Sequence, residues 1–131
     1  MKILLDTHAW FWAINEPERL SQKALKVITA TKPSQRGLAS ISIWEFAMMV
    51  TKEKVQIGTA LDQWLEQAVS NTGIAVFPLS PQIAVESCTL PGKFHKDPAD
   101  RLITATARVH GLTLVTKDTK ILDYKHVNTI W

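Results

Sequence analysis

The sequence predicts an α/β fold in which helices cover both faces of a mainly parallel sheet. Two observations support this class. Short apolar runs typical of buried strands alternate along the chain with longer stretches of helical periodicity. The runs at residues 3–5 and 112–115 also lack the polar alternation of a half-exposed strand. We therefore expect strands that are buried on both faces of the sheet.

The first unit is a strand over residues 3–5 followed by a short helix over residues 10–14. The strand is continuously apolar and ends at Asp6, as expected of a central parallel strand. The helix ends where the Asn-Glu-Pro sequence of residues 15–17 interrupts it.

A second helix is expected over residues 22–31, because Ser21 has the chemistry of an N-cap. The polar segment 32–37, which contains proline and glycine, predicts a loop. Residues 38–39 predict a very short second strand. The chain thus continues the alternation of strand and helix.

The middle of the chain predicts two helices, an edge strand and a further helix. Ser42 and Glu45 have the spacing of a capping box and are expected to open the first helix. Residues 59–70 place apolar side chains on one helical face. Residues 74–79 read as a strand whose proline favours the edge of the sheet, and a Ser-Pro pair opens a helix over residues 81–88.

The C-terminal third has the clearest local signals. Asp97 is expected to cap a helix that starts at Pro98, where a missing N–H group costs nothing. Gly111 stands where helices commonly end in a left-handed residue. A strand over residues 112–115 follows, and residues 127–130 predict a final strand.

Size and composition indicate one globular domain over residues 1–131. Hydrophobic residues make up 46% and charged residues 21%, which argues against disorder. The net charge of +3 permits a polyanionic partner without requiring one. The single Cys88 predicts a reducing compartment and a buried thiol. Without a long apolar run or a secretory signal, we expect a cytoplasmic protein and no membrane partner.

Four acids are expected at one edge of the sheet. Asp6 follows the first strand, Asp118 follows a late strand, and Glu45 and Asp100 lie in the first turns of helices that start there. Four carboxylates in one place would repel one another unless a divalent cation joined them. Oxygen ligands suit Mg²⁺ or Mn²⁺ better than zinc.

Each acid also has a purely structural explanation. Glu45 fits a capping box, Asp100 is favoured by a helix dipole, and Asp118 is common in turns. Asp6 is harder to explain in this way, because a carboxylate at the end of a central strand is partly buried and needs a partner. Only the joint arrangement favours a functional site.

The histidines and most aromatic residues suggest ordinary structural roles. His8, His95 and His126 lack the spacing of metal ligands and are expected in solvent or loops. The tryptophans are expected mainly in the core. Trp10 and Trp12 cannot both face one way on a helix, so one of them is free to cover a partner surface.

Four stretches together resemble the PIN-domain nucleases, and the chain length resembles the VapC-type toxins of toxin–antitoxin pairs. These stretches are ILLDT at residues 3–7, Glu45, DRLITATA at residues 100–107 and LVTKD at residues 114–118. Each is weak alone, but their order and spacing cover nearly the whole chain. The resemblance implies a three-layer α/β/α sandwich and a metal-dependent endoribonuclease. It also implies a homodimer that a cognate antitoxin protein holds inactive.

The resemblance also assigns roles to individual residues. It gives catalytic and Mg²⁺ or Mn²⁺ ligand roles to four acids: Asp6, Glu45, Asp100 and Asp118. It gives supporting roles to Thr7, Thr116 and Asp97, although Asp97 serves more naturally as a helix cap. Basic residues around these motifs, Lys96, Arg101 and Lys117, are expected to contact the RNA backbone. Single-stranded or loop RNA is the expected substrate.

Two alternatives remain on sequence grounds. One is a receiver-like signalling domain, which also gathers acids and magnesium at strand ends but needs a phosphoacceptor Asp after a middle strand. The other is a non-catalytic PIN-like module that binds without cleaving. A nuclease assay with an Asp6→Asn control separates catalysis from binding alone.

Overall fold

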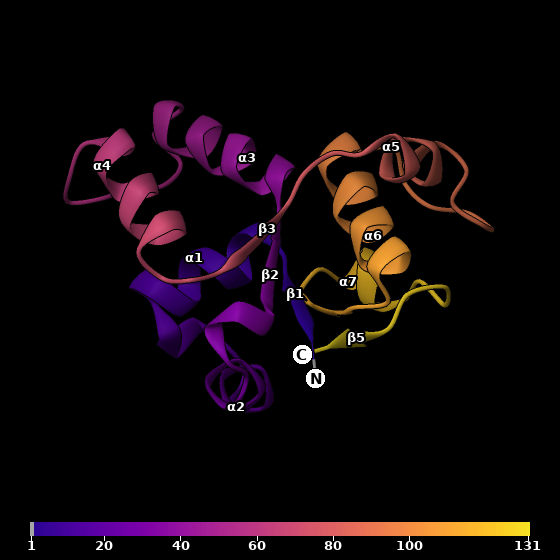
Figure 1. Cartoon of the computed structure of the whole chain (residues 1–131), viewed down its shortest axis with the longest axis horizontal. Coiled ribbons are helices and arrows are strands. Elements are labelled where there is room, and N and C mark those ends of the chain that lie inside the picture. The colour runs from indigo at the N-terminus through magenta and orange to yellow at the C-terminus, as the bar shows by residue number, and fades with distance from the viewer. Residues whose placement is uncertain (1) are drawn as a thin grey trace.

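Residues 2–131 are described by a computed structural model, in which five parallel strands form one sheet in the order β3-β2-β1-β4-β5 (Figure 1). The strands are β1 (Ile3–Leu5), β2 (Arg36–Ala39), β3 (Ala75–Phe77), β4 (Thr113–Val115) and β5 (Thr129–Ile130). The helices are α1 (Thr7–Asn15), α2 (Gln22–Ala30), α3 (Ser40–Thr51), α4 (Leu61–Leu65), α5 (Pro81–Cys88), α6 (Pro98–His110) and α7 (Thr119–Leu122). The other helical segments are the 3₁₀ turns η1 (Pro17–Arg19) and η2 (Pro33–Gln35) and the π-helical η3 (Glu66–Ser70), which continues α4.

The central strand β1 pairs in parallel with β2 on one side and β4 on the other. Leu5 is in register with Leu38 of β2 and with Val115 of β4. The carboxyl ends of the three strands therefore meet at one edge of the sheet. The segments that follow them, starting at Asp6, Ser40 and Thr116, all begin at this edge.

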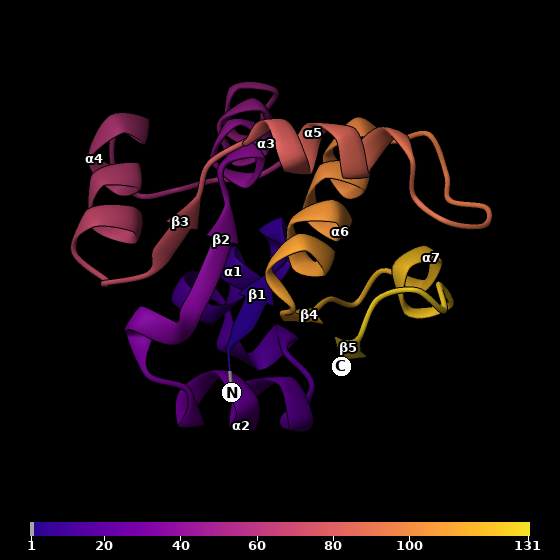
Figure 2. The ribbon, with the colours of Figure 1, turned by 45° about the vertical axis from the view of Figure 1, so that its right-hand side comes forward.

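Two helical layers enclose the sheet. Helices α1 to α4 lie on one side and α5 to α7 on the other (Figure 1). Side chains alternate along β1, so Ile3 and Leu5 pack into the core under α1 to α4, while Leu4 packs against α6. In the turned view α5 lies over one end of α6, and α2 lies at the opposite end of the molecule (Figure 2). The predicted α/β class with helices on both faces is confirmed.

The local signals around α6 give its observed limits. Asp97 caps the helix by accepting a hydrogen bond from the backbone N–H of Asp100 at 3.0 Å. Pro98 is its first residue, and Gly111 ends it with a left-handed φ of 63°. The predicted start and end of this helix are therefore confirmed. The Ser21 cap of α2 is likewise observed, through the N–H of Ala24 at 3.0 Å.

Strand β2 and helix α7 differ from the prediction. The strand starts at Arg36, inside the segment predicted as a loop. Its Gly37 lies so close to the neighbouring strand that a Cβ atom there would be 2.6 Å from the Phe77 ring. The glycine that suggested a loop is therefore required for close strand packing. The short α7, which Asp118 caps, was not predicted.

The predicted capping box of Ser42 and Glu45 is wrong. Helix α3 begins at Ser40 without a side-chain cap, so Ser42 and Glu45 lie inside the helix. The prediction of a buried Cys88 thiol is also wrong, because this residue ends α5 on its exposed side. The expectation that tryptophans fill the core fails for Trp44, whose side chain on α3 is 55% exposed. Within residues 2–131, no helix combines the length and apolar character that crossing a membrane requires.

Candidate active site

A pocket of about 610 Å³ lies at the edge of the sheet where β1 and β4 end. Five of its lining residues are acids that come from separate parts of the chain: Asp6, Glu45, Asp97, Asp100 and Asp118. Four of them are the acids that the sequence singled out as a group. Long-range folding thus brings the ends of β1 and β4, the second turn of α3 and the start of α6 to one cavity.

Asp6 is buried at the base of this pocket, and the chain holds both of its carboxylate oxygens. Oδ1 accepts the backbone N–H of Ala9 at 2.8 Å and so caps α1. Oδ2 accepts the hydroxyl of Thr116 at 2.6 Å, across the pair of strands β1 and β4. The pKa of Asp6 is raised from 3.8 to about 6, mainly by burial and in smaller part by the charge of Asp100, against the opposing effects of the two hydrogen bonds and of His8.

Glu45 is directed by Thr7, the residue that follows Asp6. The buried hydroxyl of Thr7 donates to Oε1 of Glu45 at 2.5 Å and lies 2.9 Å from the hydroxyl of Ser42. Burial raises the pKa of Glu45, and the charges of Asp100 and Asp97 add to this increase. Because Glu45 is the sixth residue of α3, it takes no part in capping that helix.

Asp100 contacts a histidine that the sequence did not single out. His95 Nε2 lies 2.6 Å from Asp100 Oδ2. Burial raises the pKa of Asp100, the charges of Asp97 and Asp118 raise it further, and the hydrogen bond with His95 lowers it. The expectation that His95 lies in a loop is confirmed, but its hydrogen bond with Asp100 was not predicted.

The loop that carries His95 is fixed by Arg101. Its guanidinium group donates to the backbone carbonyls of Ser87, Phe94 and His95 at 2.8 to 3.1 Å. No spacing rule could have identified this contact, because irregular loop backbone carries no periodic signal. Arg101, which was expected to contact RNA, uses these N–H groups to hold the loop.

The other two basic residues expected to contact RNA have different surroundings. Lys117 is exposed and lines the acid pocket, next to Asp118. Lys96 is exposed in the loop before α6 and is not among the residues that line this pocket. Lys117 is therefore the better placed of the two to meet an anion in the pocket.

The remaining acids of the pocket, Asp97 and Asp118, are less buried than Asp6, and each caps a helix. Asp118 Oδ1 accepts the backbone N–H of Lys120 at 2.8 Å, and the hydroxyl of Thr116 accepts the N–H of Asp118 at 3.1 Å. Thr116 therefore connects Asp6 to the turn that carries Asp118. One buried hydroxyl fixes the relative position of two acids from neighbouring segments.

The donor set fits a hard cation, although the acids do not converge on one point. Among residues 2–131, no three His, Cys, Asp or Glu side chains are placed so that they could hold a metal ion as they stand. Mg²⁺ commonly uses only one or two carboxylates, with water and substrate phosphate as further ligands. Oε2 of Glu45 and Oδ1 of Asp100 accept no hydrogen bond from the described residues. These two carboxylate oxygens are therefore free to act as ligands of such a cation.

Comparison with known proteins identifies related sequences and folds. The family model described as PIN domain matches residues 3–127. The chain is 36% identical over 131 residues to Ribonuclease VapC22 of Mycobacterium tuberculosis (strain ATCC 25618 / H37Rv), covering 98% of each chain.

Two solved structures have the same fold at lower identity. One is a toxin–antitoxin complex from Klebsiella pneumoniae, with a TM-score of 0.71, 21% identity and coverage of 99% of this chain and 97% of that one. The other is a DNA-bound VapBC from Salmonella typhimurium, with a TM-score of 0.72, 20% identity and the same two coverages. At these identities the likeness establishes the fold alone.

Proposed function

The chain belongs to the PIN domain family, and from that premise we propose that it is a metal-dependent endoribonuclease, the toxin of a toxin–antitoxin pair. The observation that carries this proposal is the gathering of five acids in one pocket, three of them with raised pKa values. Buried carboxylates that raise one another's pKa are unfavourable in a purely structural role. The 36% identity to a ribonuclease supports the choice of RNA as substrate.

In this proposal the catalytic carboxylates, which also hold Mg²⁺ or Mn²⁺, are Asp6, Glu45, Asp100 and Asp118. When bound, such an ion supplies charge at the scissile phosphate and an activated water for phosphodiester hydrolysis. Thr116 fixes Asp6 through its hydroxyl, and Thr7 fixes Glu45 in the same way.

Two further residues position Asp100 in this proposal. Asp97 caps α6 and so sets the direction of its first turn, which carries Asp100. His95 holds one oxygen of Asp100 and leaves the other free for the pocket. Lys117, on the wall of the same pocket, attracts the anionic RNA backbone toward the acids.

The proposed partners are a cognate antitoxin and a second copy of the chain. Large apolar side chains are exposed on α3, on α5 and before α5: Trp44 at 55%, Leu79 at 56% and Val85 at 64%. Exposed residues of this type favour a protein interface. A Val85→Glu variant that changes the molecular mass measured by light scattering would assign α5 to the homodimer; an unchanged mass would exclude α5 from that interface.

The function is tested by incubating the purified chain with a single-stranded RNA oligonucleotide. We expect cleavage with Mg²⁺ or Mn²⁺, no cleavage in chelator, and recovery when the metal is restored. Asp6→Asn and Asp100→Asn should each reduce the cleavage rate at least ~100-fold, as expected for loss of a charged group in the reacting site. Asp123→Asn removes an exposed acid outside the pocket and is the matched control.

The assay also separates the proposed enzyme from a non-catalytic binding module. RNA binding without metal-dependent cleavage by the wild type would support the module and contradict the proposal. Equal activity of wild type and Asp6→Asn would attribute the cleavage to a contaminant and contradict it as well.

A further inference from the structure

Two residues of α1 form a wall between the acid pocket and a second cavity. This second cavity has a volume of about 800 Å³ and lies between α1 and the 54–59 segment that joins α3 to α4. His8 and Trp12 line both cavities. The two cavities therefore adjoin at these two side chains.

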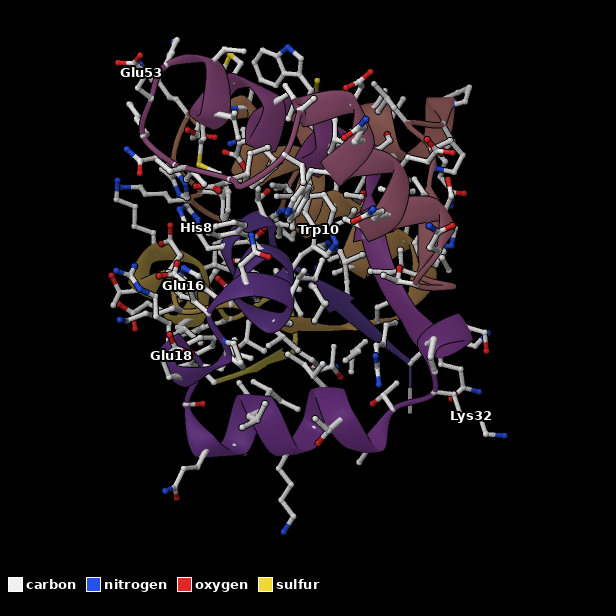
Figure 3. The ribbon with its side chains drawn as sticks, turned by 90° about the vertical axis from the view of Figure 1, so that its left-hand side faces the viewer. His8, Trp10, Glu16, Glu18, Lys32 and Glu53 are labelled. Atoms are coloured by element: carbon white, nitrogen blue, oxygen red, sulfur yellow. The ribbon has the colours of Figure 1, made fainter. Side chains whose placement is uncertain are left out.

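Trp12 differs from Trp10, which stands two residues earlier on the same helix. Trp10 is 1% exposed and packs edge-on against Phe46 and Trp64, with ring centroids 5.5 Å apart in each case. Figure 3 shows Trp10 directed toward the α4 side of α1, while His8 lies on another side together with Glu16. Trp12 remains partly exposed on the side of His8, with ring centroids 5.4 Å apart. Trp12 also contacts Trp131, with ring centroids 6.1 Å apart, but it is the more exposed of the two tryptophans of α1.

Two basic side chains lie near the Trp12 ring. Lys117 Nζ is 5.8 Å from the ring centroid and lines the acid pocket. Arg19 Cζ is 5.7 Å from the same centroid and lines the second cavity. Within residues 2–131, Arg19 forms one ion pair, with Glu16 at 3.6 Å. This pair is exposed and therefore holds the guanidinium group only weakly. Trp12 thus lies between a cation on the acid side and a cation on the cavity side.

We propose that Trp12, Lys117 and Arg19 form the subsite for the unpaired nucleotide next to the scissile phosphate of the RNA substrate. The base lies on Trp12, and the phosphates on either side of that nucleotide are held by Lys117 and Arg19. This inference rests on the proposed nuclease function and adds to it the path of the strand. The flanking strand leaves the acid pocket over α1 and enters the second cavity.

The chemistry of the wall favours RNA over other occupants. Aromatic rings accept any unpaired base by stacking, and each such contact contributes substantially to binding. In a duplex the bases already stack on one another, so Trp12 can engage only unpaired RNA. Four basic residues line the two cavities and complement a polyanion: Arg19, Lys54, Lys117 and Lys120.

The first experiment measures the affinity for a single-stranded RNA oligonucleotide in an Asp6→Asn background, which prevents cleavage. Trp12→Ala should raise Kd about 5- to 150-fold, the range for loss of one base–aromatic stack. Trp12→Phe should recover most of the affinity, because phenyl rings also stack. Affinity for a fully duplex RNA should be unaffected by either change.

The phosphate contacts are tested by salt dependence. Lys117→Gln and Arg19→Gln should each weaken binding and reduce the slope of log Kd against log salt concentration by about one. Lys26→Gln removes an exposed cation of α2 that lines neither cavity and is the matched control. The control should keep both the affinity and the slope of its parent.

A scan with abasic nucleotides distinguishes stacking from a structural role of Trp12. With Trp12 present, an abasic nucleotide at one position next to the cleavage site should weaken RNA binding. With Trp12→Ala, the same abasic RNA should bind as tightly as the intact RNA. A merely structural tryptophan would leave this position-specific penalty intact in the variant. If Trp12→Ala fails to fold, Trp12→Leu gives the same comparison, because leucine fills much of the same space with apolar atoms but has no aromatic face for a base.

The outcomes separate this inference from the proposed function. Absence of metal-dependent RNA cleavage by the wild type would contradict the proposed function itself. Cleavage by the wild type, together with unchanged RNA affinity in the Trp12 and Lys117 variants, would overturn the subsite alone. Unchanged RNA affinity with loss of inhibition by an antitoxin would assign the wall to a protein partner and overturn it equally.

Discussion

Replacing Asp6 with asparagine should stabilise the metal-free protein while abolishing its activity. The asparagine side chain has nearly the same shape, and its oxygen can still cap α1 through the N–H of Ala9. Its amide N–H₂ can donate to the hydroxyl of Thr116, which reverses the present hydrogen bond. The main change is therefore the loss of a buried negative charge.

The magnitude follows from the raised pKa of Asp6. The carboxyl binds its proton with a pKa of about 6 in the folded protein and 3.8 when exposed. Between these values the folded state holds a proton that the unfolded state has lost, so the free energy of unfolding falls as pH rises from about 4 to about 6. One pKa unit corresponds to about 1.4 kcal/mol, so the charged form costs about 3 kcal/mol at neutral pH.

Urea denaturation in chelator measures this effect directly. At neutral pH the free energy of unfolding of Asp6→Asn should exceed that of the wild type by up to about 3 kcal/mol. The free energies of the two proteins should converge near pH ~4. Added Mg²⁺ should stabilise the wild type by mass action and leave the variant almost unchanged. The exposed-acid variant Asp123→Asn should follow the wild-type curve. A variant that is no more stable than wild type at neutral pH, with the same pH dependence, would refute this electrostatic reasoning.

Three further substitutions test separate contacts. Thr7→Val removes the hydroxyl that directs Glu45 and should lower the RNA cleavage rate about 10- to 100-fold; a rate within twofold of wild type would deny this contact a catalytic role. His95→Ala frees Asp100 and should weaken Mg²⁺ affinity, measured by titration calorimetry, by about 10- to 100-fold; unchanged affinity would contradict a positioning role. Gly37→Ala places a Cβ atom 2.6 Å from a phenyl ring of β3 and should cost about 1–3 kcal/mol in urea denaturation; full stability would show that β3 moves aside freely.

The parts of the fold that sequence reasoning predicted depend on local chemistry. Helix α6 is the clearest case, because Asp97, Pro98 and Gly111 each act through their own backbone. Strand β1 could be predicted equally well from the sequence, because its three consecutive apolar residues are buried on alternate faces of the sheet. Parallel topology then placed the ends of such strands at one edge of the sheet, which is why the acids could be expected in one pocket.

What the sequence left unpredicted depends on contacts between distant segments. The partner of Glu45 is Thr7, 38 residues away, and local spacing suggested Ser42 instead. His95 lies in an irregular loop whose shape is set by three hydrogen bonds from Arg101. The different burial of Trp10 and Trp12 likewise depends on which helices cover α1. Residue pattern identifies the kind of side chain at each position but not its partner.

Helix capping alone does not account for the acids of the pocket. Three of them do cap helices: Asp6 caps α1, Asp97 caps α6 and Asp118 caps α7. The two helices capped elsewhere by a side chain, α2 and α5, use the neutral serines Ser21 and Ser80.

Of the three aspartate caps only Asp6 is buried, and a serine there would satisfy the same backbone N–H group without burying a charge. An aspartate at this position therefore requires a reason beyond capping α1. Glu45 and Asp100 cap nothing, yet burial raises the pKa of both. A cation bound beside Asp6, Glu45 and Asp100 would offset the cost of burial that these three carboxylates share, which is why the stability of Asp6→Asn and its response to Mg²⁺ test the site itself.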